Sequence, residues 1–409
     1  MLLNKPRALE LMREHDLVAI IGTTHENVTY LTGHVGWSVR VYRQRKNHAL
    51  MVNDPAAGTD LIVSRSDITY YATYGGFAER TYSYGGQGIH IMPKDWTPDG
   101  EMKRYVELNS SAQTHKTLLD ALLAALKARG ISKGKIALDE EGCGPELFRA
   151  LKEKLPQCEF IPGSGLFLMI RLVKTEDELQ ALRAAAQINE DACEAVFRCI
   201  RPGVTENEVA EVWRQAVATP GGMWHWFHFN SGSRSVAIFP PTERKLSKGD
   251  LFMFDSGLYY QNYNSDTGSC GSLGEPSAQA KREWKAIDEG FHETLSVVKA
   301  GVTGGQIYHA LVKNIKARWL GFEAVFAGHT IGLEAREFPF ILGPETKHNQ
   351  PFLPATSEIP LPVNSVINIE APMGTYGFGG YQIEYTIVVK ENGWEPILPQ
   401  KRHFRVIEA

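Results

Sequence analysis

Apolar and polar positions follow different patterns in the first and second parts of the chain. In the first part, short apolar runs predict buried strands at residues 17–21, 49–52, 61–63 and 135–138. Apolar residues at helical spacing predict helices at residues 5–15, 112–129 and 145–155. Strands that alternate with helices predict a mixed α/β domain, which we place at residues 1–168.

One segment of this first part departs from the alternation. Residues 69–88 are rich in tyrosine and contain two glycine pairs. Aromatic side chains between turn-forming glycines indicate loops and edge strands held by aromatic packing. We therefore expect irregular structure here.

The second part, residues 169–409, opens with a helix-start signal. Thr175 followed by Glu178 forms a capping box, which predicts a helix that runs to about residue 199. A second helix is expected at residues 206–217. A strand and a loop should then follow over residues 221–233.

Two stretches of the second part resemble each other. Residues 361–370 align without gaps on residues 246–255, and each stretch is a leucine, a polar turn, a mostly apolar run and an acid. A Gly-Val-Thr sequence at 203–205 recurs at 301–303, each time three residues before a Glu or Gln that completes a capping box. The sequence therefore predicts two diverged copies of one unit of helices followed by strands.

Each copy carries two acids, and the two aspartates are expected at the ends of apolar segments that should form adjacent strands. The acids are Asp255 and Asp266 in the first copy, and Glu370 and Glu384 in the second. An isolated carboxylate in an apolar strand is costly, and a metal ion is one remedy. His329, with Gly328 and Gly332 nearby, is a fifth candidate ligand. Four carboxylates and a histidine suit two divalent ions roughly 3.5–4 Å apart, which make water a nucleophile near neutral pH.

In type, order and spacing, these five residues resemble the metal ligands of the pita-bread superfamily. Its members include methionine aminopeptidase, aminopeptidase P, prolidase and creatinase, and a non-peptidase branch such as ectoine hydrolase and dimethylsulfoniopropionate lyase. The resemblance covers essentially the whole chain. The segment from Asn27 to Gly33, read as the end of an early strand, resembles the creatinase and prolidase type of N-terminal domain. The resemblance implies an α/β N-terminal domain and an α+β pita-bread catalytic domain with an internal pseudo-twofold repeat.

The chain differs from peptidases of this superfamily around the metal ligands. Those peptidases carry a histidine after a Ser-Gly-x-Asn turn, where this chain has Phe239 after a turn that ends in Arg234. Arg336 stands where they carry a second histidine, and Gln382 and Tyr385 replace other polar or charged residues. Arginine stays protonated, so Arg336 can hold an anion but cannot act as a general base.

These comparisons imply roles for several residues. Glu370 is expected to accept and return a proton, with His228 and Arg336 as further catalytic candidates. The candidate substrate contacts are His225, Arg234, Phe239, Trp37 and Arg40, with structural packing as the alternative for each. Trp37 and Arg40 are candidates because the N-terminal domain of one subunit often reaches the neighbouring active site in relatives, which also implies a homodimer.

Three functions remain open at this point. The first is a hydrolase with two divalent ions (Mn, Fe, Co or Zn) that cleaves a C–N bond in a small amino-acid-like substrate, as Xaa-Pro peptidases and creatinase do. The second is a metal-dependent lyase of the dimethylsulfoniopropionate-cleaving type. The third is a non-catalytic pseudoenzyme, against which the five intact ligands argue.

Net charge, apolar runs and cysteine content indicate which binding partners and which compartment to expect. A formal net charge of −4 gives no electrostatic reason to expect nucleic acid or an anionic membrane as a partner. The charged N-terminus lacks the apolar run of a signal peptide, and no stretch approaches the roughly 20 apolar residues of a membrane span. Five cysteines without close metal-type pairs suit reduced thiols, so we expect a cytoplasmic enzyme that acts on a small molecule.

Overall fold

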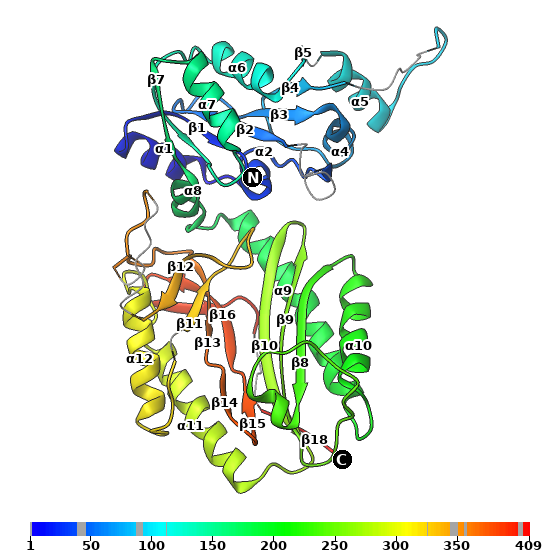
Figure 1. The fold of residues 1–409 in the computed structure, drawn as a ribbon, viewed down its shortest axis with the longest axis vertical. Helices are drawn as coiled ribbons and strands as arrows, with labels where there is room; N and C mark the ends of the chain where they lie inside the picture. Colours follow the sequence, from blue (N-terminus) through cyan, green and yellow to red (C-terminus); the bar gives the residue numbers. More distant parts are fainter. Residues whose placement is uncertain are drawn as a thin grey trace. The chain divides into compact units, whose positions relative to one another are not determined.

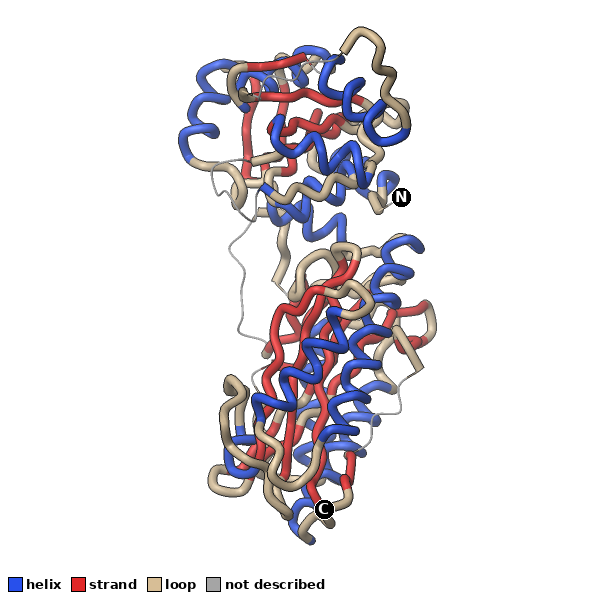
Figure 2. Tube along the Cα trace, turned by 90° about the vertical axis from the view of Figure 1, so that its right-hand side faces the viewer, coloured by secondary structure: helices blue, strands red, loops and turns tan. Residues whose placement is uncertain are grey.

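A computed structural model describes residues 2–38, 46–86, 93–111, 113–324, 326–343, 351–355, 358–399 and 404–409. The chain divides into two compact units (Figures 1 and 2). The N-terminal unit comprises Met1–Arg171 with Asn349–Leu353, and the C-terminal unit comprises Leu172–His348 with Pro354–Ala409.

The N-terminal unit is built on a seven-stranded sheet in the order β5-β4-β3-β2-β1-β6-β7. Only β2 runs antiparallel to its neighbours in this sheet. The strands are β1 (Leu17–Gly22), β2 (His48–Val52), β3 (Asp60–Ser64), β4 (Arg80–Tyr84), β5 (Gln113–His115), β6 (Gly134–Leu138) and β7 (Cys158–Pro162). Residues of β2 and β3 are buried throughout, as expected for central strands that are covered on both faces.

Helices pack around this sheet. They are α1 (Lys5–Glu14), α2 (His25–Thr32), α4 (Ile68–Tyr74), α5 (Gly100–Ser111), α6 (Leu118–Ala128), α7 (Pro145–Lys154) and α8 (Ser164–Arg171), with a short 3-10 turn η1 (Arg65–Asp67). The leucine-rich face of α6 joins the core with Leu122 and Leu126, as its periodicity predicts.

Three predictions for the N-terminal unit are wrong in whole or in part. A helix was expected from residue 112, but residues 113–115 form strand β5 and helix α6 begins at Leu118 after its Thr117 cap. Residues 27–32 lie in helix α2, capped by Thr24 and ended by Gly33 at φ 72°, and do not end a strand. Residues 68–74 form helix α4, where loops and edge strands were expected. The segment that follows does contain the edge-side strand β4.

The C-terminal unit contains two principal sheets, in the orders β18-β10-β9-β8 and β12-β11-β13-β16-β17, and a small pair, β14-β15. The first sheet comprises β8 (Met223–Ser231), β9 (Leu251–Tyr260), β10 (Tyr263–Leu273) and β18 (Arg405–Ile407). The others comprise β11 (Phe326–Thr330), β12 (Glu337–Leu342), β13 (Val366–Glu370), β14 (Met373–Thr375), β15 (Gly379–Tyr381), β16 (Glu384–Lys390) and β17 (Gly393–Pro396).

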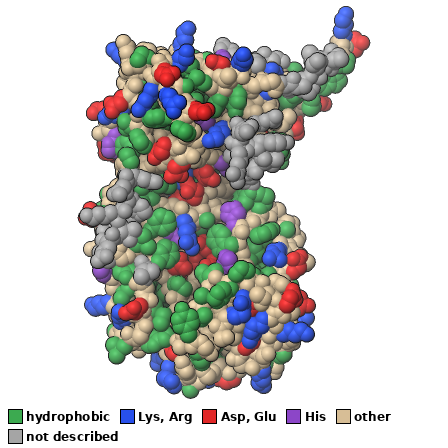
Figure 3. Space-filling view, viewed as in Figure 1, with side chains coloured by type: hydrophobic (Ala, Val, Ile, Leu, Met, Phe, Trp, Pro, Cys, Tyr) green, Lys and Arg blue, Asp and Glu red, His purple; other side chains and the backbone are tan. Residues whose placement is uncertain are grey.

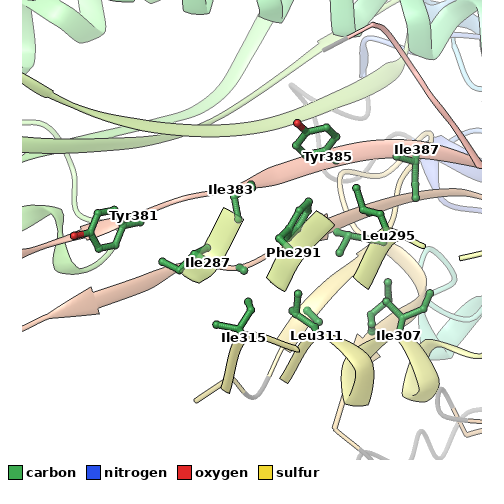
Figure 4. Close-up of a cluster of buried hydrophobic side chains, with 14 of the residues drawn as sticks. Ile287, Phe291, Leu295, Ile307, Leu311, Ile315, Tyr381, Ile383, Tyr385 and Ile387 are labelled. Carbon is green, nitrogen blue, oxygen red and sulfur yellow. The ribbon is translucent and has the colours of Figure 1, made fainter. Parts of the chain in front are cut away.

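Two pairs of helices accompany these sheets: α9 (Glu176–Cys199) with α10 (Glu206–Ala218), and α11 (Ala278–Leu295) with α12 (Gly304–Lys316). A 3-10 turn, η2 (Gly232–Val236), follows β8. Figure 4 shows side chains of α11 and α12 pointing toward Ile383, Tyr385 and Ile387 around β16, which form one apolar core. None of the described helices combines the length and apolar character that a membrane span requires.

The predicted repeat is present in the hydrogen bonds as well as in the element order. Gly203 and Gly301 both have a φ of 86°. The N–H of Gly203 donates to Leu246 O at 2.8 Å, and that of Gly301 donates to Leu361 O at 2.9 Å. Both predicted capping boxes are formed, at Thr205 and at Thr303. The two helix–strand units therefore start from the same local geometry.

Candidate metal centre

The four acids lie on paired strands of the two principal sheets. In the β9–β10 pair, Asp255 lies opposite Gly268 and Asp266 lies opposite Gly257. In the β13–β16 pair, Glu370 lies opposite Glu384. β9 continues to Tyr260, so Asp255 sits within a strand and not at the strand end that its apolar run predicted.

The five predicted ligands come together in the C-terminal unit. Asp255, Asp266 and Glu384 each present a carboxylate oxygen, and these three oxygens lie within 4.8 Å of one another. Nε2 of His329 lies 3.2 Å from Oδ2 of Asp266 and 4.0 Å from Oε1 of Glu370. The two sheets meet here, because the Thr386 hydroxyl on β16 donates to Asp266 O on β10 at 3.3 Å.

Burial disfavours the charged forms of the five side chains in this cluster. Burial raises the pKa of Asp255 and of Glu370. Burial and then neighbouring carboxylates raise the pKa of Asp266 and of Glu384 well above the usual range. Burial lowers the pKa of His329. Protons or cations must balance these carboxylates, and divalent ions would do so directly.

Neutral donors hold several of the carboxylates. The indole N–H of Trp226 donates to Asp255 Oδ1 at 2.7 Å. The amide of Gln382 donates to Glu370 Oε2 at 3.1 Å and to Glu384 Oε2 at 3.3 Å, and Asn368 also donates to Glu384. These donors orient the carboxylates without neutralising their charge, as donors behind metal ligands do.

Two buried polar atoms support the metal interpretation. Nδ1 of His329 is 2.9 Å from Thr330 O, so Nδ1 carries the proton that it donates to this carbonyl. Nε2 is then unprotonated and has a lone pair that can bind a metal. Nε2 of His329 and Oδ1 of Asp266 are buried without a hydrogen-bond partner among the described residues. Imidazole and carboxylate donors suit first-row divalent metals, so these side chains fit the implied ions.

A cavity of about 500 Å³ opens at Asp255 and is lined by Trp226, His228, Ile238, Asp255, Glu334, Ala335 and Arg336. Figure 3 shows acidic side chains gathered on this unit, with histidine and basic side chains beside them. Trp226, Ile238, Glu334 and Ala335 were not predicted as site residues. Trp226 could have been found from its position two residues before His228 on the same strand.

Arg336 and His228 lie at this cavity. Arg336 is exposed, its Cζ lies 5.6 Å from the centre of the Phe326 ring, and it has no ion pair within the part of the chain that the structure describes. His228 lies opposite Asp255 in the β8–β9 pair, and its Nδ1 has no hydrogen-bond partner among the described residues. Both residues can therefore receive a ligand.

Three other predicted contacts in this unit are not among the residues that line this cavity. His225 is exposed and its ring lies 4.6 Å from that of Tyr259. Nε of Arg234 lies 3.4 Å from Oε2 of Glu206, and its Cζ lies 5.1 Å from the centre of the Phe239 ring. A substrate role for His225, Arg234 or Phe239 stays a prediction.

The remaining two predicted contacts belong to the N-terminal unit. The ring of Trp37 lies 5.7 Å from that of Tyr70. Arg40 lies outside the described residues. Their expected role in a neighbouring subunit stays a prediction.

Family comparisons agree with the fold and the site. Residues 180–391 match the model of metallopeptidase family M24, and residues 6–173 match the creatinase/prolidase N-terminal domain. The chain therefore belongs to metallopeptidase family M24, and the expected α/β N-terminal domain and pita-bread catalytic domain are confirmed. It is a metal-dependent hydrolase.

Individual relatives within this family share about a quarter of their aligned residues with this chain. An uncharacterised peptidase of Bacillus subtilis, YqhT, is 23% identical over 337 residues, which cover 81% of this chain and 91% of that protein. A Xaa-Pro dipeptidase of Pyrococcus horikoshii is 27% identical over 258 residues, covering 62% of this chain and 70% of that protein. The crystal structure of X-Pro aminopeptidase from Thermotoga maritima shares the fold, with a TM-score of 0.74, 24% identity and 99% coverage of both chains.

Proposed function

We propose that this enzyme hydrolyses a C–N bond in a small amino-acid-like substrate that carries a carboxylate, with Xaa-Pro dipeptides as the first class to test. The observation that carries the proposal is the convergence of four buried carboxylates and His329 beside a small cavity. The Xaa-Pro dipeptidase of Pyrococcus horikoshii adds support for the substrate class.

Asp255, Asp266, His329, Glu370 and Glu384 would hold two divalent ions of Mn, Fe, Co or Zn. When bound, such ions polarise the carbonyl of the scissile bond and increase the acidity of a water molecule. Glu370 would accept a proton from the attacking water and return it to the departing nitrogen. The amide of Gln382 donates to Glu370 Oε2 at 3.1 Å, which restrains the orientation of this carboxylate.

The cavity residues would select the substrate. Arg336 supplies a positive charge and a planar set of donors that match a carboxylate. His228 supplies an imidazole beside Asp255, where it can donate to a substrate oxygen. Trp226, Ile238 and Ala335 supply apolar surface in a cavity of about 500 Å³, which suits a compound of dipeptide size.

A homodimer and a cytoplasmic location belong to the same proposal. The five cysteines are all free, which suits a reducing compartment. Sedimentation of the purified protein would measure the oligomeric state, and a monomer at micromolar concentration would contradict the dimer.

The direct test is hydrolysis of Xaa-Pro dipeptides and of small non-peptide amides by protein loaded separately with each metal. In water labelled with ¹⁸O, hydrolysis places the label in the carboxylate product, whereas elimination leaves it out. We expect labelled product, and its loss in Glu370→Gln. The matched control is Glu391→Gln, an exposed acid in the turn between β16 and β17. Unlabelled product, or full activity of Glu370→Gln, would contradict the proposal.

A further inference from the structure

Strand β8 contains a bulge beside the metal centre. Trp224 lies opposite Leu258, but Trp226 lies opposite Gly257. An advance of one residue along β9 therefore corresponds to an advance of two residues along β8. His225 is the additional residue. Bulges of this kind re-aim the side chains that follow them. Here Trp224 is 54% exposed, whereas Trp226 lines the cavity with His228.

The indole of Trp226 lies directly against the backbone of β9. A Cβ atom built on Gly257 would lie only 2.1–2.3 Å from three atoms of the Trp226 ring. Any side chain at position 257 would therefore displace the indole. The bulge and Gly257 together place the ring where its N–H reaches Asp255 Oδ1 at 2.7 Å.

We propose that Trp226 is a positioning residue for the metal centre. It acts by orienting the carboxylate of Asp255. The inference rests on the proposed function, because Asp255 is a metal ligand only within it. An ordinary aspartate side chain can rotate about two bonds. The hydrogen bond to Oδ1 restrains that rotation while Asp255 presents a carboxylate oxygen to Asp266 and Glu384. A neutral donor achieves this without repelling a cation.

The test compares three variants by their affinity for Mn²⁺ and Co²⁺, measured by calorimetry on the full chain. Trp226→Phe keeps an aromatic ring over Gly257 but removes the N–H. Gly257→Ala keeps the N–H but displaces the ring. Trp224→Phe is the matched control, because this exposed indole packs against Arg214 and not against a carboxylate.

We expect Trp226→Phe and Gly257→Ala to weaken metal binding by about ten- to a hundredfold, the usual effect of losing a donor behind a ligand. The visible absorption of the Co²⁺ protein should also change in both, since that spectrum reports ligand geometry. Trp224→Phe should match the wild type in both measurements. A purely structural role for Trp226 would lower the unfolding temperature and leave the spectrum and the affinity unchanged.

The outcomes separate this inference from the proposed function. If the wild type binds Mn²⁺ or Co²⁺ and Trp226→Phe binds equally well with the same spectrum, the positioning role is overturned and the proposed function stands. If the wild type binds neither ion, both are overturned.

Discussion

Arg336 and Arg234 show how local partners decide what an arginine can do. Arg234 was predicted to contact substrate, and Arg336 was predicted as a catalytic candidate that can hold an anion. Arg234 already faces Glu206 and Phe239, whereas Arg336 lines the cavity and has no ion pair among the described residues. The guanidinium of Arg336 is therefore the better candidate for binding a substrate carboxylate.

Replacement of Arg336 should affect substrate binding more than turnover. A hydrogen bond to a charged group contributes about 1.5–3 kcal/mol, so Arg336→Met should raise KM by about ten- to a hundredfold. Arg336→Lys should recover part of this effect, because lysine keeps the charge but not the planar pair of donors. Steady-state kinetics with a dipeptide and with its C-terminal amide would check this. An equal loss on both substrates would count against the assigned role.

Lys174 and Glu337 form a buried ion pair in the C-terminal unit. Lys174 Nζ lies 2.7 Å from Glu337 Oε2, and both side chains are almost wholly buried. Removal of one partner leaves an uncompensated charge, which costs about 3–5 kcal/mol of folding free energy. We expect Lys174→Met to destabilise by that amount and the double variant Lys174→Met/Glu337→Gln to be less destabilised. Urea unfolding would measure both, and additive losses would contradict the coupling.

At the scale of elements, signals with a local cause were the easiest to predict. The capping boxes at Thr175, Thr205 and Thr303 are all formed, because a threonine and an acid or amide three residues later complete each other locally. Helix α2 was not predicted, because its β-branched residues and tyrosine favour a strand, whereas the Thr24 cap starts a helix.

The candidate site was predictable only in part, because some of its residues are brought there by tertiary packing and not by a local sequence signal. The four acids and His329 follow from residue type and the internal repeat. Ile238 and Ala335 carry no such chemical signal, and tertiary packing alone brings them to the cavity. The bulge that directs Trp226 also depends on the pairing of β8 with β9, which local sequence does not report.

Two capping boxes of the same type should respond oppositely to pH. Burial raises the pKa of Glu178 to about 7, whereas the backbone N–H of Thr205 lowers the pKa of the exposed Glu208. Folded protein then holds the Glu178 proton at pH values where unfolded protein has lost it. Glu178 thus makes stability fall as pH rises from its unfolded pKa, about 4.5, toward 7.

Glu178→Gln should therefore reduce the loss of stability between pH 5 and pH 7. The free energy of unfolding, measured in urea at both pH values, would check this. Glu208→Gln is the control and should leave that difference unchanged, because Glu208 is ionised in both folded and unfolded protein over this range. An unchanged slope in Glu178→Gln would show that the group does not titrate there.

At the scale of the whole molecule, the two units should respond differently to metal. All five predicted ligands lie in the C-terminal unit, and a ligand stabilises the folded state that binds it by about 4 kcal/mol at a thousand times its Kd. Calorimetry should show two transitions, of which chelator lowers only one. A common shift of both transitions, or no shift, would contradict this expectation.

Acid should also destabilise the N-terminal unit, independently of metal. Burial lowers the pKa of His34 to about 3 and that of His48 to about 4, so both stay neutral in the folded N-terminal unit. Unfolded histidines bind protons below about pH 6.5, so stability falls as pH decreases from there toward the folded values. The metal-independent transition should thus move to lower temperature between pH 7 and pH 5. A transition that does not move would contradict the prediction.

The internal repeat of the C-terminal unit divides the carboxylates equally, because β9 and β10 supply two and β13 and β16 supply two. In the proposed centre, each copy would therefore supply only half of the carboxylates that hold the metal ions. Separation of the two copies would then release the ions. Metal binding and the packing of the two copies against each other would thus be coupled. This enzyme would lose its metal centre before it lost its secondary structure.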